Sequence, residues 1–205
     1  MKSGSKNSSS TPPPSKMKER RLARQREKQR AQLIRIGSIV GGIVLVFLLI
    51  YFIGNSNQPN VDIEGLQTFN ISGGHTTEPV TYPEVPPVGG VHNPAWQTCG
   101  VYSQPVANEN AVHSMEHGAV WITYQPDLPA AEVEALQTLT RQSGHRLLSP
   151  YPDLPSPIVI SGWGNQLQLE KADDPRLSQF ITAFEQSPRV PEPGASCSGG
   201  VGEPE

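Results

Sequence analysis

Basic residues are scarce beyond position 35, where five Lys and Arg stand against seventeen Asp and Glu, a net charge of −12. This acidity argues against nucleic acid as a partner. The sequence G-x-S-x-G is missing, and no glycine-rich phosphate loop follows a strand, so neither a serine hydrolase nor a nucleotide site is indicated. Neither Ser114 nor Cys99 has the sequence context of a catalytic nucleophile. The sequence therefore favours a protein that is not an enzyme.

Charge and proline are both absent from residues 36–53, which read IGSIVGGIVLVFLLIYFI. Eighteen helical residues rise roughly 27 Å, close to the thickness of the hydrocarbon core, so this run predicts a transmembrane helix. Residues 1–35 hold eleven Lys and Arg and two acids, and the positive-inside rule then places the N-terminus in the cytoplasm. A cleaved signal peptide fits less well, because the basic region is too long. We predict a single-pass protein of the cell membrane with an extracytoplasmic C-terminal domain.

Composition divides the chain into five parts. These are a basic cytosolic arm, first disordered and then helical, the membrane helix, a linker, an outer domain and a flexible tail, at residues 1–35, 36–53, 54–60, 61–197 and 198–205. The basic arm should rest on anionic lipid, so the lipid bilayer is the expected partner. A protein of the cell envelope is the other partner that we consider for the acidic domain.

Only two cysteines occur, Cys99 and Cys197, and both follow the apolar run. Outside the cytosol, two cysteines in one domain usually pair. We expect a disulfide that closes a loop of about one hundred residues. The alternative is that Cys99 is a free thiol or a metal ligand.

The outer domain begins with an irregular stretch, rich in Pro and Gly, that extends to about residue 109 and predicts an ordered loop. A buried strand is predicted at 119–124, a helix at 128–144, short strands at 146–148, 157–161 and 166–170, and a helix from Pro175 capped by Asp173 or Asp174. This order indicates an α+β domain in which two helices cover a short, mostly antiparallel sheet.

Five histidines all lie in this domain: His75, His92, His113, His117 and His145. The densest group is HSMEHG, residues 113–118. In a helix, His113 and His117 share one face with Glu116 beside them, the H-x-x-E-H order of inverted zinc peptidases. In an extended segment, Met115 joins the two histidines on one side, a set that suits copper.

Several motifs, taken together and in order, resemble the domain-of-unknown-function 3105 family over about residues 60–197. They are GGH at 73–75, TYPEVPPVGGVH at 81–92, GVY at 100–102, VHSMEHGAVWITY at 112–124, SPYPDLPSPIVISGWG at 149–164 and PEPGASC at 191–197. The resemblance implies a bacterial membrane-anchored outer domain and brings no activity with it. Other aliphatic residues also fit the position of Met115, which favours a site made of histidines over a soft-metal site.

We expect the clustered residues to bind zinc or copper. The candidate ligands are His75, His92, His113, Glu116 and His117. The alternative is a structural or protein-interaction module of the envelope, in which the same side chains satisfy loop backbone groups and no metal binds. A zinc-dependent hydrolase is a remote alternative, because H-x-x-E-H needs a helix of several turns whereas Gly118 and a strand follow at once.

Overall fold

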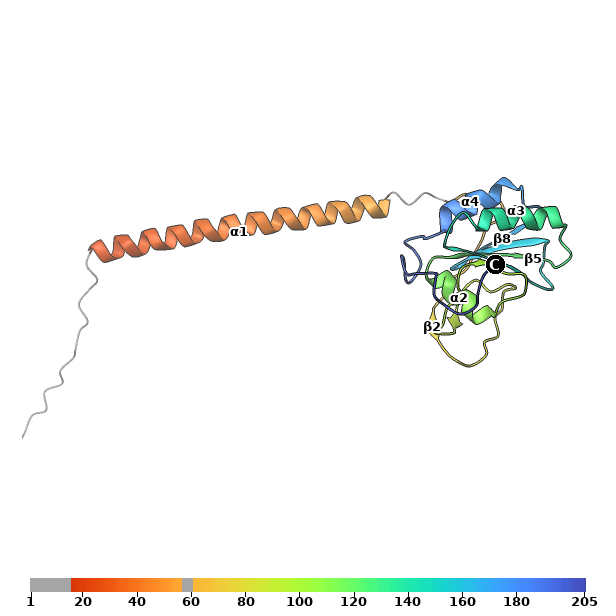
Figure 1. Cartoon of the computed structure of the whole chain (residues 1–205). Helices are drawn as coiled ribbons and strands as arrows, with labels where there is room; N and C mark the ends of the chain where they lie inside the picture. The colour runs from red at the N-terminus through yellow and green to blue at the C-terminus, as the bar shows by residue number, and fades with distance from the viewer. Residues whose placement is uncertain (1–15, 57–60) are drawn as a thin grey trace, which may run out of the picture. The chain divides into compact units, whose positions relative to one another are not determined.

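The computed structural model describes residues 16–56 and 61–205, and the chain divides at Asn60 into two units. The described part of the first unit is one helix, α1 (Lys16–Ser56), which continues from the predicted arm helix through the apolar run without a break (Figure 1). Its segment Arg26–Leu49 is long and apolar enough to cross a membrane. The predicted disordered segment 1–15 and linker residues 57–60 lie outside the described residues.

The second unit is built on a six-stranded mixed sheet with the order β1-β8-β7-β5-β6-β4. Its strands are β1 (Gln67–Thr68), β4 (Gly100–Val101), β5 (Val120–Tyr124), β6 (Arg146–Pro150), β7 (Ile158–Gly162) and β8 (Asn165–Leu169). Strand β6 is parallel to β4 and β5, whereas the other neighbours are antiparallel. The predicted α+β class is confirmed. The sheet is mixed because the helix between β5 and β6 returns the chain to the end where β5 began.

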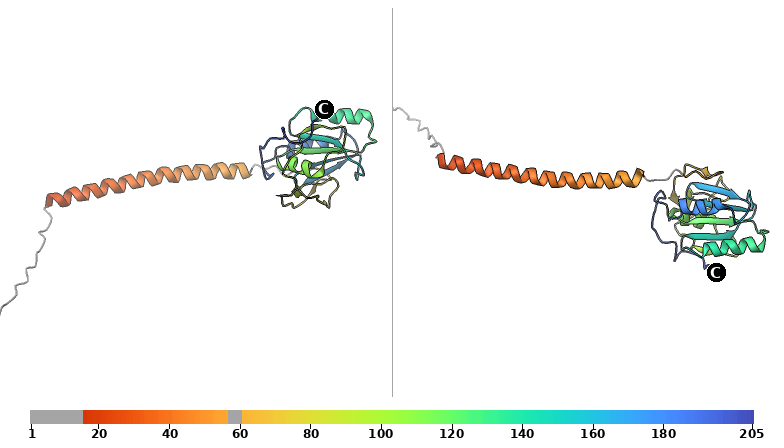
Figure 2. Two further views of the ribbon diagram at one scale, coloured as in Figure 1. Left: turned by 60° about the horizontal axis from the view of Figure 1, so that its bottom comes forward. Right: turned by 90° about the horizontal axis from the view of Figure 1, so that it is seen from above.

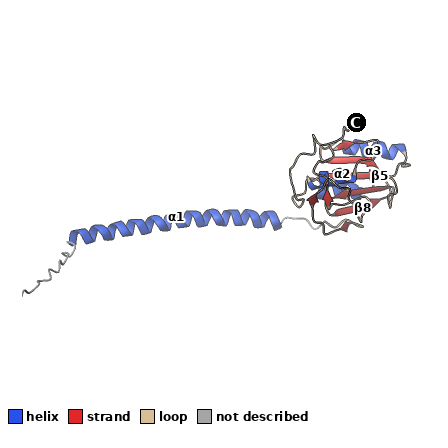
Figure 3. Cartoon of the chain, turned by 90° about the horizontal axis from the view of Figure 1, so that it is seen from below, coloured by secondary structure: helices blue, strands red, loops and turns tan. Residues whose placement is uncertain are grey.

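Helices cover both faces of this sheet. Helices α3 (Ala130–Thr140) and α4 (Pro175–Phe184) lie in front of the strands seen from above (Figure 2, right). Helix α2 (Asn108–Glu116) lies in front of them seen from below (Figure 3). Alternate residues of β5 explain this: Val120 and Ile122 pack with α3 and α4, whereas Trp121 packs with α2. The two predicted covering helices are present, and α2 adds a third layer.

A separate two-stranded sheet joins β2 (Gly74–His75) to β3 (Val91–His92) in parallel. The sequence predicts an ordered loop for this region, and the structure adds this short strand pair. The parallel register sets His75 opposite His92, so two histidines seventeen residues apart become direct neighbours.

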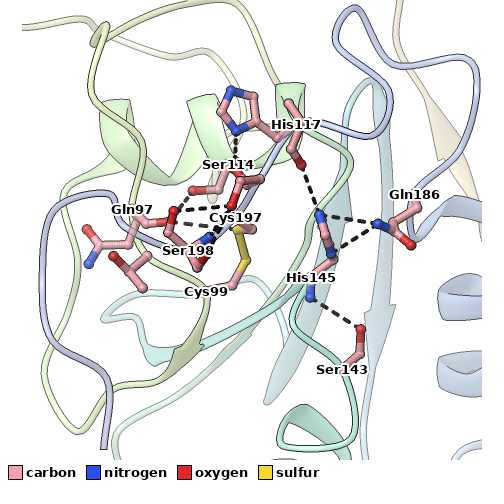
Figure 4. Close-up of a disulfide and its surroundings, with 12 residues drawn as sticks. Gln97, Cys99, Ser114, His117, Ser143, His145, Gln186, Cys197 and Ser198 are labelled. Atoms are coloured by element: carbon pink, nitrogen blue, oxygen red, sulfur yellow. Dashed lines mark hydrogen bonds between the residues drawn. A yellow bond between two sulfur atoms is a disulfide. The ribbon is translucent and has the colours of Figure 1, made fainter.

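The disulfide between Cys99 and Cys197 is present (Figure 4). The Cys99 amide also donates to the Cys197 carbonyl at 2.8 Å. The tail predicted at 198–205 makes backbone hydrogen bonds with the domain. Amides of Thr98 and Glu205 donate to Val201 and Val101, so the segment is tied along residues 96–101. The disulfide favours these hydrogen bonds, because it places the two backbones side by side.

Of the two predicted N-cap residues of helix α4, Asp173 and Asp174, the structure shows Asp174 in this role. The Asp174 carboxylate accepts from the Arg176 amide at 2.9 Å and from its guanidinium at 2.6 Å. These hydrogen bonds from Arg176 hold the pKa of Asp174 below its ordinary value. Asp173 is exposed and makes no such cap.

We expect Asp174→Ala to lower the free energy of unfolding by about 1 kcal/mol, since a lost N-cap leaves helix amides unpaired. Asp173→Ala is the matched control and should change it by less than about 0.5 kcal/mol. Because the folded pKa is depressed, the carboxylate stabilises the fold above the unfolded pKa. The difference from wild type should therefore fade in acid, as the pH drops through the folded pKa. Urea unfolding at neutral and acidic pH checks both points, and equal losses in the two variants would contradict the cap.

Candidate metal centre

Residues 113–116 of the HSMEHG motif form the last turn of helix α2, as in the helical alternative, and their side chains lie on different faces of the helix. Met115 is fully buried and packs with Trp121 of the sheet. The alternative in which Met115 joins the histidines on one side is therefore wrong. Residues 113 and 116, one turn apart, lie on another face, away from this core. The helix ends before Gly118, whose φ of +92° turns the chain into β5 and whose missing Cβ would meet the Gln186 backbone at 3.0 Å.

The β2–β3 pair brings two further histidines to this face of α2. His75 and His92 are paired in the register, and their rings lie 4.8 Å apart between centroids. Gly73, just before β2, allows the close approach, because a Cβ there would stand 3.1 Å from Glu116 Oε1. Strands and helix thus converge on one point although they are distant in sequence.

Four side chains form what we call the first donor set. Their possible ligand atoms all lie within 4.8 Å of one another, and the members are His75, His92, His113 and Glu116. Glu116 Oε2 lies 3.0 Å from His92 Nε2 and 3.4 Å from His75 Nε2. The His75 side chain is 47% exposed, whereas the other three are buried. The set therefore opens to solvent through one ligand.

Three histidine rings are oriented by backbone carbonyls. Nδ1 of His92, His113 and His117 lies 2.7 Å from the carbonyl oxygen of Gly90, Asn93 and Ser196, respectively. A carbonyl oxygen only accepts, so each Nδ1 carries the proton. In the neutral ring Nε2 is then a bare lone pair. This is the arrangement that prepares a histidine to bind a metal.

Burial lowers the pKa of His113, and the neighbouring His117 and His92 lower it further, against the opposing effect of the Asn93 carbonyl and the Glu116 carboxylate. The imidazole of His113 is therefore neutral at neutral pH. A neutral ring is the form that ligates a metal.

His117 is separated from most of the other predicted ligands. Its ring lies 4.6 Å from that of His113, as the i, i+4 spacing on a helix requires, but it belongs to a second donor set of His113, His117 and Glu192. Glu192 Oε2 lies 3.3 Å from His117 Nε2. Sequence reasoning missed Glu192. The available signal was its place five positions before Cys197, which was expected to form a disulfide with Cys99.

Two tryptophans flank the histidines, and one histidine stands apart. Trp163 contacts His92 edge-on at 5.8 Å between ring centroids, and Trp96 lies 5.1 Å from His117. Aromatic walls of this kind limit access of water to the donor atoms. His145, which was not among the predicted ligands, lies outside both donor sets: its Nδ1 accepts from the Gln186 amide and its Nε2 donates to the Ala195 carbonyl (Figure 4).

The family described as "Protein of unknown function (DUF3105)" matches residues 75–199, more than half of the chain. The chain belongs to the DUF3105 family. The matched range contains every member of both donor sets and both cysteines of the disulfide. No significant match was found among curated proteins or among solved structures. The DUF3105 description carries no activity, so the function is argued from the geometry of the site.

Proposed function

We propose that this DUF3105 protein is a membrane-anchored, extracytoplasmic domain that binds a divalent transition-metal ion, zinc in the first place, on the first donor set. The carrying observation is the pair His92 and Glu116. His92 Nδ1–H is committed to the Gly90 carbonyl, so a neutral His92 turns a lone pair toward a carboxyl oxygen of Glu116 3.0 Å away. Two buried acceptors at that distance need a proton or a metal ion between them.

A metal ion supplies that charge better than a proton. A protonated His92 would be buried beside two other histidines, His75 and His113, whose ring centroids lie 4.8 and 4.9 Å from its own. A divalent ion instead meets Glu116 and the Nε2 lone pairs at once. The separations of 3.0 and 3.4 Å between donor atoms are close to the edge of a zinc tetrahedron, roughly 3.3 Å for bonds of about 2.0 Å.

The types of donor favour zinc over reduced copper. Soft thiolate and thioether ligands select Cu(I), but Met115 packs in the core and both cysteines form the disulfide. Imidazole and carboxylate suit Zn²⁺, and imidazole also suits Cu²⁺. Comparison of the two ions therefore belongs in the same titration.

A hydrolase is not part of the proposal. Helix α2 has nine residues and ends at Glu116, before His117. Glu116 faces His75 and His92 as a donor, so it is not left free as the general base that the peptidase motif uses.

The outer location rests on two supports. The Lys and Arg residues before the apolar run favour a cytoplasmic N-terminus by the positive-inside rule. The disulfide favours an oxidising compartment, since reducing systems of the cytosol keep thiols reduced. The proposed partner is accordingly the lipid bilayer, with a protein of the envelope as a further one.

His75→Ala tests the proposal with little risk to the fold, because this side chain is 47% exposed. The full-length chain, purified in detergent without a metal-binding tag, should bind zinc at least about 10- to 100-fold more weakly, the loss that even indirect ligand partners cause. His145→Ala, a histidine outside both donor sets, is the matched control and should keep wild-type affinity.

Competition with a chromophoric chelator measures these affinities, first with zinc and then with copper. If the wild type retains neither ion, the structural or protein-interaction module becomes the better account. Equal affinities of the His75→Ala and His145→Ala variants would remove the first donor set.

A further inference from the structure

In the second donor set, as in the first, an imidazole lone pair faces a carboxyl oxygen. The Nδ1–H of His117 donates to the Ser196 carbonyl at 2.7 Å, so its Nε2 is a lone pair when the ring is neutral. That lone pair faces Glu192 Oε2 at 3.3 Å. The His117 side chain is 5% exposed, and the Glu192 side chain is 50% exposed. A largely buried imidazole thus turns an acceptor toward an acceptor for a second time in one molecule.

His113 lies between the two sets and is counted in both. Its Nδ1 is committed to the Asn93 carbonyl, so Nε2 offers one lone pair and can bind one ion at a time. When His113 serves the second set, each set has two imidazoles and one carboxylate. His75, His92 and Glu116 form one group, and His113, His117 and Glu192 form the other.

Two histidines and a glutamate form a known zinc ligand set that keeps one coordination position open. Pairs of such ions in neighbouring positions are an established class of metal site. We propose that the domain holds a second divalent transition-metal ion on His113, His117 and Glu192, beside the ion of the first set. This inference rests on the proposed function, because it takes the first position as occupied.

The carboxylate of the second metal position comes from a part of the chain that contributes nothing to the first donor set. Glu192 and the Ser196 carbonyl lie in the C-terminal segment, residues 192–205, which the disulfide at Cys197 holds against residue 99. The Glu192 amide also donates to the Glu116 carbonyl at 3.2 Å, which places this segment over the end of α2. Figure 4 shows the disulfide and His117 as neighbours. The second ion therefore depends on this segment, whereas no residue of the segment belongs to the first donor set.

The test counts zinc ions in the full-length, oxidised chain in detergent micelles. Equilibrium dialysis against buffered Zn²⁺ followed by elemental analysis should give two ions per wild-type chain. Glu192→Gln removes the carboxylate but keeps the size of the side chain, and His117→Gln removes the imidazole; each should give one ion. Glu203→Gln is the matched control, an exposed glutamate of the same C-terminal segment, and should keep two.

Cobalt gives a second readout that a general loss of structure would not imitate. Two adjacent Co²⁺ ions should show magnetic coupling in the wild type, and Glu192→Gln should show the signal of one isolated ion. One ion per wild-type chain, or two ions retained in Glu192→Gln, would overturn the second position. One wild-type ion that is lost with His75→Ala would leave the proposed function standing, whereas no ion at all would remove both.

Discussion

Glu116→Gln should leave the metal-free protein at least as stable as the wild type and should abolish most of its stabilisation by zinc. In the metal-free wild type, Glu116 Oε2 faces the lone pair of His92 Nε2 at 3.0 Å. A glutamine amide in its place can donate to that lone pair, so the contact becomes a hydrogen bond. The same change removes the one carboxylate of the first donor set.

The expected size of the zinc effect follows from binding linkage. A ligand present at a thousandfold its Kd stabilises the folded state by about 4.1 kcal/mol. For a domain of this size that corresponds to a rise in Tm of roughly 10 °C. The fluorescence of the tryptophans, all of which lie in the second unit, follows unfolding with and without zinc. Glu134→Gln, an exposed glutamate on α3, is the control and should keep the full shift.

The direction of the metal-free result separates the two accounts of the cluster. If His92 is instead a buried imidazolium paired with Glu116 in a purely structural role, Glu116→Gln leaves a charge unpaired. That change should cost about 3 to 5 kcal/mol. A strong loss of stability without metal, together with no zinc shift in the wild type, would therefore establish the structural cluster.

Replacing both Cys99 and Cys197 by Ala should lower the free energy of unfolding by about 4 to 5 kcal/mol in the chain-entropy account of a loop of this length. The disulfide spans 98 residues and ties the C-terminal segment to residues 96–101. Urea unfolding of the full-length chain in detergent, followed by tryptophan fluorescence, measures the loss. Reduced wild type is the control and should unfold close to the double variant.

Alkylation of the protein before any reduction tests both the presence of the disulfide and the proposed outer location. Neither cysteine should be labelled when the chain is taken directly from cells, because the proposed outer location would expose the folding domain to oxidising conditions. Two accessible thiols would contradict both the disulfide and the outer location.

The elements with strong local patterns were predictable. Strand β5 is a run of β-branched and aromatic residues, and α4 carries its proline and capping carboxylate at its start, so their type and approximate ends follow from local sequence. The β2–β3 pair was missed, since two-residue strands in a proline-rich segment leave no periodic signal. The exact start of α2 was missed for a related reason: its N-cap, Ala107, offers no capping side chain.

The candidate ligands were predictable as residue types but not as groups. Helical spacing, which is local, linked His113 and His117, with Glu116 beside them. The closeness of Glu116 to His75 and His92 depends on a parallel register between segments that are far apart in the chain. The closeness of Glu192 to His117 depends on the disulfide and on the hydrogen bonds of the C-terminal segment.

The long apolar helix, the α+β class of the second unit and the residue types available for a metal follow from local sequence, because each depends on composition or on periodicity along the chain. Which ligand atoms lie close together follows from the tertiary structure and not from local sequence. Register, helix termination and the disulfide bring the ligand atoms of each donor set within 4.8 Å of one another, and such long-range contacts depend on the packing of the whole domain.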